Sequence, residues 1–219
     1  KESFVTPEDQ DGAVNVQASG AAGAVSQYVD MDKTAQTEAE LISQYRQLSL
    51  QPEVEYAIDE IVNEAIAGDE SEVVDINLDS IDKTLLGDAT KKKVSEEFDN
   101  ILNMMNFNNI AYETFRRWVI DGRMYYHIIV DENKPQDGIL ELRYIDPRKI
   151  RKIREVKKEK DPKTGVHFIK NINEYFIYDD KGIASKPGQY KSAQLDDKAL
   201  KISKDAVAYC PSGLVDQDK

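Results

Sequence analysis

Two acidic residues and a lysine in the second half of the chain have the types and order found in metal-dependent nucleases. Asp146 is followed by Glu155 and Lys157, with one residue between the last two. In a site of that kind the two carboxylates hold Mg²⁺ and the lysine lies near the attacking water. Glu-x-Lys is also frequent by chance in a chain in which 32% of the residues are charged, and Asp146 precedes Pro147 as a turn residue does. Nuclease chemistry is therefore kept as an alternative hypothesis.

Other catalytic and cofactor chemistry has less support. The chain holds two histidines, His127 and His167, and a single cysteine, Cys210. Acyl transfer needs a nucleophile with a base in reach, and zinc needs several Cys or His ligands at regular spacing. No Gly-rich loop ending in Gly-Lys-Ser/Thr is present to bind a nucleotide phosphate. We therefore predict no enzyme activity, no metal site and no cofactor, with structural roles for His127 and Cys210.

A basic segment is the next candidate site. Residues 141–170 contain 11 Lys and Arg against five acids, whereas residues 1–72 contain 16 acids against three bases. Three interpretations stay open for the basic segment: a solvated strand face, a contact with a neighbouring subunit or another protein, and a DNA-facing patch. If identical copies assemble head to tail, the acidic part of one copy is a candidate partner for the basic part of the next. The candidate interface residues of this segment are Arg148, Lys149, Arg151, Lys152 and Arg154.

A second pair of basic residues precedes this segment. Arg116 and Arg117 lie beside Trp118, which helical spacing places next to Phe115 in a core. Arginine is favoured in interface ion pairs, so both arginines are added to the candidate interface with a neighbouring subunit or another protein. Local pairing with Glu113 or Asp121 is the alternative.

Composition limits the possible partners. The net charge of −12 argues against binding nucleic acid over the whole surface, because phosphate contacts need local positive charge. No stretch approaches the roughly 18 apolar residues that a membrane span requires. A lone cysteine forms no internal disulfide, which is typical of a reducing compartment. The first residue is not methionine and the last residues form no closing element, so we expect a fragment of a longer protein.

Hydrophobic periodicity predicts an α+β fold with helices first. Residues 1–35 lack any period and are predicted to be a disordered or extended arm. Apolar residues at helical spacing, with a capping box at Thr37 and Glu40 and a proline at the first turn of the second helix, predict four helices. These helices are expected at 37–49, 52–68, 90–105 and from about 110 to 122, with a half-buried strand at 72–78.

The chain from Arg123 onward has strand character. Alternating apolar residues and turn signals predict an antiparallel meander, with a hairpin-type loop at 161–165 and a polar, irregular stretch at 181–199. The expected strands cover 124–130, 139–145, 150–156, 166–178 and 202–209. The predicted domain organisation is an arm at 1–35, a helical part at 36–122 and a β-rich part at 123–219.

An ordered series of segments resembles the portal proteins of T4-like tailed bacteriophages. No single segment is specific, but the series follows the family's order through residues 37–216. The segments are Glu38–Arg46, Glu55–Val62, Glu72–Leu78, Phe115–Arg123, Glu141–Arg148, Glu174–Tyr178 and Ala208–Asp216. The resemblance implies that the helical and β-rich parts are the wing of a portal subunit, with the family's stem, clip and crown beyond Lys219.

The same resemblance implies a structural function. Portal subunits form a ring, a dodecamer in this family, at one capsid vertex of the virion. Double-stranded DNA passes through the ring during packaging and ejection, and the ring docks the terminase and later the neck and tail proteins. The expected partners are further copies of the chain, the major capsid protein, terminase, neck and tail proteins and DNA. The expected location is the virion, with host cytoplasm during assembly. A stand-alone binding module with an arm that orders on a partner is a further alternative.

Overall fold

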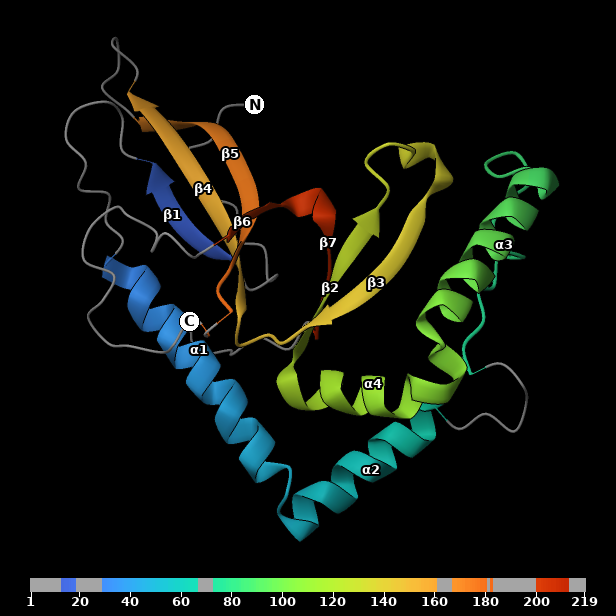
Figure 1. Cartoon of the computed structure of the whole chain (residues 1–219), viewed down its shortest axis with the longest axis horizontal. Coiled ribbons are helices and arrows are strands. Elements are labelled where there is room, and N and C mark those ends of the chain that lie inside the picture. Colours follow the sequence, from blue (N-terminus) through green and yellow to red (C-terminus); the bar gives the residue numbers. More distant parts are fainter. Residues whose placement is uncertain are drawn as a thin grey trace. The chain divides into compact units, whose positions relative to one another are not determined.

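The computed structural model describes residues 13–18, 29–66, 73–160, 167–180, 182 and 200–212. Its helices are α1 (Val29–Leu48), α2 (Pro52–Ile66), α3 (Asp88–Met105) and α4 (Phe107–Asp121), with short 3-10 turns at Pro135–Asp137 and Lys204–Ala206. Its strands are β1 (Val14–Ala18), β2 (Arg123–Val130), β3 (Ile139–Ile145), β4 (Ile150–Lys160), β5 (His167–Tyr178), β6 (Leu200–Ser203) and β7 (Val207–Pro211). The predicted α+β order, helices before the β meander, is confirmed (Figure 1).

The chain divides into two compact units, and each combines segments that are distant in the sequence. The first unit contains Lys1–Gln47, Asp121–His127 and Tyr144–Lys219, and the second contains Leu48–Ile120 and Ile128–Arg143. Most of the 1–35 arm, the loop at 161–165 and nearly all of the stretch at 181–199 lie outside the described residues.

The strands form two sheets. A four-stranded sheet has the order β1-β4-β5-β6, and a three-stranded sheet has the order β3-β2-β7. β4 and β5 pair antiparallel from Ile150↔Tyr178 to Lys160↔His167, which fits the hairpin predicted between them. β1 pairs with β4 in parallel, with Val14 opposite Ile153, and so departs from the predicted all-antiparallel meander.

The apolar core of the first unit lies where strands of both sheets meet. Tyr125, Ile150, Phe176 and Val207 are buried together. The Tyr125 ring stacks on Tyr209 at a centroid distance of 4.7 Å and meets Phe176 edge-on at 6.0 Å. Such aromatic pairs add stability beyond their buried area, so this cluster joins β2 and β7 of one sheet to β4 and β5 of the other.

The second unit is mainly helical. Val62 of α2 is fully buried, and Ala111 and Thr114 of α4 are buried. The predicted buried side of α4, which includes Phe115 and Trp118, is only half-buried. The Phe115 and Trp118 rings do lie together, with centroids 5.5 Å apart.

Four boundary predictions need correction. α1 begins at Val29, ahead of the capping box expected at Thr37. α4 begins at Phe107, because Asn106 alone, in the left-handed conformation at φ 51°, separates it from α3. The strand expected at 202–209 is two strands, β6 and β7, with a 3-10 turn between them. β4 does not continue the sheet of β3: at the Asp146–Lys149 turn the chain passes into the other sheet.

The strand predicted at 72–78 is also wrong. Residues 74–78 form no strand, although their apolar and polar residues alternate. The backbone N–H of Ile76 donates to the Asp75 carboxylate at 2.7 Å, and that of Asp79 donates to the Asn77 side chain at 3.0 Å. These short side chains take the donors that a neighbouring strand would need, so the segment crosses to α3 as a loop.

Candidate functional site

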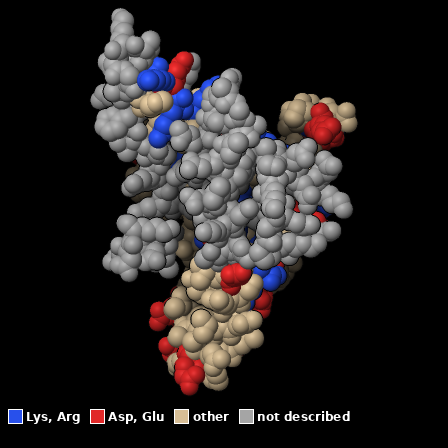
Figure 2. Space-filling view, turned by 90° about the vertical axis from the view of Figure 1, so that its left-hand side faces the viewer, with Lys and Arg blue, Asp and Glu red and all other residues tan. Residues whose placement is uncertain are grey.

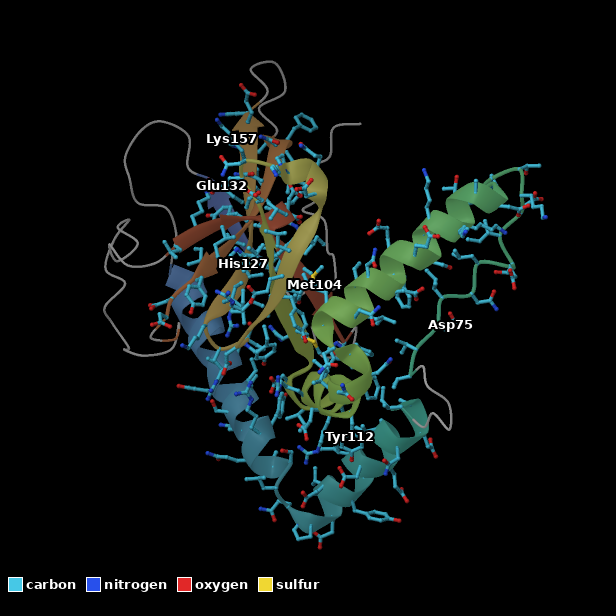
Figure 3. The ribbon with its side chains drawn as sticks, turned by 45° about the vertical axis from the view of Figure 1, so that its right-hand side comes forward. Asp75, Met104, Tyr112, His127, Glu132 and Lys157 are labelled. Atoms are coloured by element: carbon cyan, nitrogen blue, oxygen red, sulfur yellow. The ribbon has the colours of Figure 1, made fainter. Side chains whose placement is uncertain are left out.

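The structure does not bring the nuclease-like residues together. Asp146 precedes β4, whereas Glu155 and Lys157 lie five and seven residues into that strand. At about 3.3 Å per residue, Lys157 is roughly 23 Å beyond the start of the strand. Figure 3 shows Lys157 near the free end of β4. Among the described residues, no group of three or more His, Cys, Asp or Glu side chains is placed to hold a metal ion.

The Asp146 carboxylate instead accepts hydrogen bonds from two arginines. Arg148 Nη2 lies 2.8 Å from Asp146 Oδ2, and Arg46 Nη1 lies 3.2 Å from the same oxygen. The backbone N–H of Arg148 also donates to Asp146 Oδ1 at 2.9 Å. Burial alone would raise the pKa of Asp146, but the hydrogen bonds from Arg148 and the charge of Arg46 outweigh it and hold that pKa well below its usual range. A carboxylate held in this way acts as a structural anchor.

Two arginines of the basic segment are inside the protein. Arg151 and Arg154 are each only 2% exposed, so the interpretation of β4 as a solvated basic face is wrong for both. Arg154 binds Glu174 of the paired strand β5, with Nη2 and Nε each 2.8 Å from Glu174 Oε1. Lys152 lies 3.7 Å from the other oxygen of the same carboxylate. Glu174 therefore neutralises two basic side chains of β4 within one copy of the chain.

Arg151 pairs with the acidic N-terminal part of its own chain. Arg151 Nε lies 3.0 Å from Glu38 Oε2 of α1, and Arg123 Nη1 of β2 lies 2.9 Å from the same oxygen. Arg151 Nη1 also donates to the carbonyl oxygens of Pro147 and Ile150. Burial lowers the pKa of Arg151 against the opposing charge of Glu38, whereas for Arg123 that charge and its polar neighbours outweigh burial and the pKa is raised. The charge complementarity that we expected between copies of the chain therefore occurs here within one copy, between Arg151 and Glu38.

A second ion pair holds the end of α1. Arg46 Nη2 and Nε lie 2.7 and 2.8 Å from the two oxygens of Asp121, whose side chain is 1% exposed. The hydrogen bond to Asp121 raises the pKa of Arg46 despite partial burial. Our sequence analysis did not select Arg46, although one signal was available: it is the only base between Lys33 and Lys83.

The remaining candidates of the basic segment are more accessible. The side chains of Arg148 and Lys149 are 42% and 38% exposed, and Lys149 Nζ lies 2.9 Å from Asp180 Oδ1. Whether any of these residues contacts another subunit stays a prediction.

In the second unit Arg116 and Arg117 differ. Arg116 reaches across to α2, where its Nε lies 3.4 Å from Asp59 Oδ1 and its Nη2 lies 3.8 Å from Glu55 Oε1. The Tyr112 hydroxyl donates to the same Asp59 oxygen at 3.0 Å, and Figure 3 shows Tyr112 between α4 and α2. Local pairing of Arg116 with Glu113 or Asp121 is therefore wrong. Arg117 is exposed and stays a candidate interface residue.

These polar contacts lie inside a segment with known relatives. Residues 38–219 match the family described as Bacteriophage T4-like portal protein (Gp20). The chain belongs to the T4-like portal protein family. The matched region begins at Glu38 and includes every ion pair described above. The resemblance inferred from the ordered segments is confirmed.

Two portal proteins illustrate the relationship. The chain is 33% identical over 219 residues to the portal protein of Vibrio phage KVP40, covering 97% of this chain and 41% of that protein. It is 29% identical over 219 residues to the portal protein of Salmonella phage ViI, covering 97% of this chain and 38% of that protein. The chain thus spans about two fifths of the length of these portal relatives. None of its described helices is long and apolar enough to cross a membrane.

Proposed function

We propose that the chain is the wing region of a structural portal subunit, which assembles with copies of itself into a closed ring at one vertex of a phage capsid. The match to the portal family over residues 38–219 carries this proposal. The site geometry agrees with it, because Asp146 is held by two arginines, whereas Glu155 and Lys157 lie further along β4. No observation favours an enzyme or a stand-alone binding module.

A ring subunit must keep its shape while DNA moves through the assembly. The ion pairs of Glu38 and Arg46 serve that purpose, because each ties α1 to segments more than 70 residues away in the sequence. Buried pairs of this kind tolerate little change of geometry, since a displaced charge would be left without a partner. On this proposal the first unit behaves as one rigid body when force acts on the ring.

The further partners follow from the proposed ring. Twelve copies would enclose a channel for double-stranded DNA. The ring would dock the terminase during packaging and later bind the neck and tail proteins. The wing would contact the major capsid protein. The subunit would reside in the virion after assembly in the host cytoplasm. Residues 1–35 would be an arm, 36–122 and 123–219 the helical and β-rich parts of the wing, and the stem, clip and crown would be supplied by the rest of the subunit.

The proposed contacts between subunits or with capsid use the accessible members of the candidate set. Arg148 and Lys149 combine charge with an exposed side chain, whereas Arg151 and Arg154 act inside the chain. Lys149→Glu is expected to weaken ring or capsid assembly. Arg143→Glu is the control, because Arg143, like Lys149, is accessible and pairs with an acid of its own chain, Glu141, but lies outside the candidate set.

Native mass spectrometry of the full-length protein tests the proposal. A closed ring near twelve copies, with a central channel in electron-microscope images, is the expected result. A stable monomer or dimer at high concentration would contradict it. A Mg²⁺-dependent cleavage of DNA that Glu155→Ala abolishes would support the nuclease alternative instead.

A further inference from the structure

Half of the apolar face of α2 is uncovered. Seven apolar residues form a stripe along this helix, but only the inner edge of the stripe, centred on the fully buried Val62, packs against the rest of the second unit. Val54 and Ile61 are 38% and 51% exposed, and Leu50 just before the helix is 72% exposed. At 100° per residue Val54 and Ile61 fall within about 20° of one another, and together with Leu50, which precedes the helix, they are here called the α2 strip.

Acidic residues border the α2 strip on its outer side. Glu53, Glu60 and Glu64 are all exposed and lie about 80° to 120° around the helix from Val54, on the side away from Val62. α2 contains no lysine or arginine. In Figure 2 Asp and Glu atoms border an otherwise uncharged surface at the bottom of the view, at the height where α2 begins in Figure 1. The strip therefore suits a partner that is apolar at its centre and basic at its edge.

The first turns of α3 have that composition. Val94 is 36% exposed, and the exposed Lys93 lies about 100° from it around the helix, whereas Lys91, about 60° away on the other side, is half-buried and donates to the carbonyl oxygen of Ile81. Lys92 lies about 160° from Val94 and is 3.7 Å from Glu96 of its own helix. None of the ion pairs among the described residues joins α3 to Glu53, Glu60 or Glu64.

The two surfaces lie at opposite ends of the second unit. In Figures 1 and 3 the last turn of α3 adjoins α4, and its first turns lie at the other end of that helix, away from α2. A surface at one end that complements a surface at the other end is the arrangement that closes head-to-tail rings. The same two surfaces cannot meet within one copy without unfolding the helices between them.

We propose that the α2 strip of one copy packs against the first turns of α3 of a neighbouring copy, with Glu60 and Glu64 facing Lys93. The occupant is a second copy of this chain, which rests on the proposed ring. Charge complementarity selects it over an uncharged apolar partner, because both surfaces carry exposed apolar residues with opposite charges at their borders.

Cysteine cross-linking in the full-length protein tests the contact. Ile61→Cys and Val94→Cys are combined in a Cys210→Ser background, and the oxidised protein is analysed on a non-reducing gel. A ladder of linked subunits is expected from the double variant and from neither single variant. A ring that forms by native mass spectrometry without any ladder overturns the contact while leaving the portal function intact, whereas the absence of a ring in the unmodified protein contradicts the function itself.

Charge reversal tests the same contact if the cysteine variant does not assemble. Lys93→Glu should raise the concentration for half-maximal ring assembly about tenfold, which corresponds to about 1.4 kcal/mol. Lys92→Glu is the matched control and should leave assembly unchanged. Adding Glu64→Lys to Lys93→Glu restores opposite charges across every contact and should recover assembly. Equal effects of the two lysine variants, or no recovery, would overturn the proposal.

Discussion

Replacing Asp121 by Asn should loosen α1 from the rest of the first unit. The Asp121 side chain is almost fully buried and accepts two charge-assisted hydrogen bonds, at 2.7 and 2.8 Å, from Arg46 of α1. Asparagine has nearly the same shape but keeps one acceptor and no charge. The substitution therefore removes the ion pair and leaves the packing in place.

The expected cost is about 2–3 kcal/mol. A hydrogen bond to a charged group contributes roughly 1.5–3 kcal/mol, and breaking a fully buried ion pair costs roughly 3–5 kcal/mol. Arg46 is 30% exposed and keeps Asp146 at 3.2 Å, so part of its charge stays compensated and the lower range applies.

Hydrogen exchange measured by mass spectrometry reports this loss of stability in α1 itself. The amides of α1 exchange through opening of that helix, so their protection reports its opening free energy. A loss of about 2–3 kcal/mol should accelerate their exchange roughly 30- to 150-fold. Glu141→Gln is the matched control, because Glu141 holds Arg143 in the same bidentate geometry, at 2.8 and 2.9 Å, on an exposed stretch of β3. Its effect on β3 exchange should stay below about threefold.

Equal acceleration by Asp121→Asn and Glu141→Gln would refute the reasoning, since burial would then make no difference to the two pairs. A double variant separates the pair from the packing. Adding Arg46→Met to Asp121→Asn removes the uncompensated charge, so it should recover part of the lost protection.

Three further results are expected in denaturation experiments. Because the folded-state pKa of Asp146 is depressed, the stability that this carboxylate contributes is complete above the unfolded-state pKa near 3.9 and is lost as the pH falls below it. Asp146→Asn should therefore reduce the slope of unfolding free energy against pH between about pH 5 and 2. An unchanged slope would contradict this. Val62→Ala should cost about 2–3 kcal/mol in urea titrations followed by circular dichroism, because Val62 is fully buried, whereas Val54→Ala on the same helix should cost less than about 0.5 kcal/mol. Asn106 has φ 51°, so Asn106→Val should lower the thermal midpoint by the equivalent of about 1–2 kcal/mol, whereas Asn106→Gly should change it little.

The elements that the sequence predicted well are those with a strong local period. α2, β3 and β5 lie within about two residues of their predicted bounds, because an apolar stripe or an alternation identifies each without knowledge of its partner. The 72–78 segment marks the limit of that reasoning. Its alternation is real, but the side chains of Asp75 and Asn77 bond the backbone, and no sequence period distinguishes the two outcomes.

The candidate site was less predictable, because a sequence shows which residues are charged but not which of them are buried. Arg151 and Arg154 lie three residues apart on a strand and therefore point to opposite faces, so a single exposed basic face cannot contain both. Each is buried because an acid reaches it from another element, Glu38 from α1 and Glu174 from β5. The parallel pairing of β1 with β4 was missed for a similar reason, because the four helices lie between these two strands in the sequence.

The ion pairs on α1 also explain how a helix with little buried apolar surface is positioned. Among the described part of α1, Ala39 and Ile42 are the buried apolar residues, and contacts this small allow a helix to turn or slide at low cost. Glu38 and Arg46 are eight residues apart, about 12 Å along the axis, and both must meet fixed partners. A shift of one residue would turn both side chains by about 100° and break both pairs at once. The charges therefore specify the register of α1, which apolar packing alone would leave undetermined.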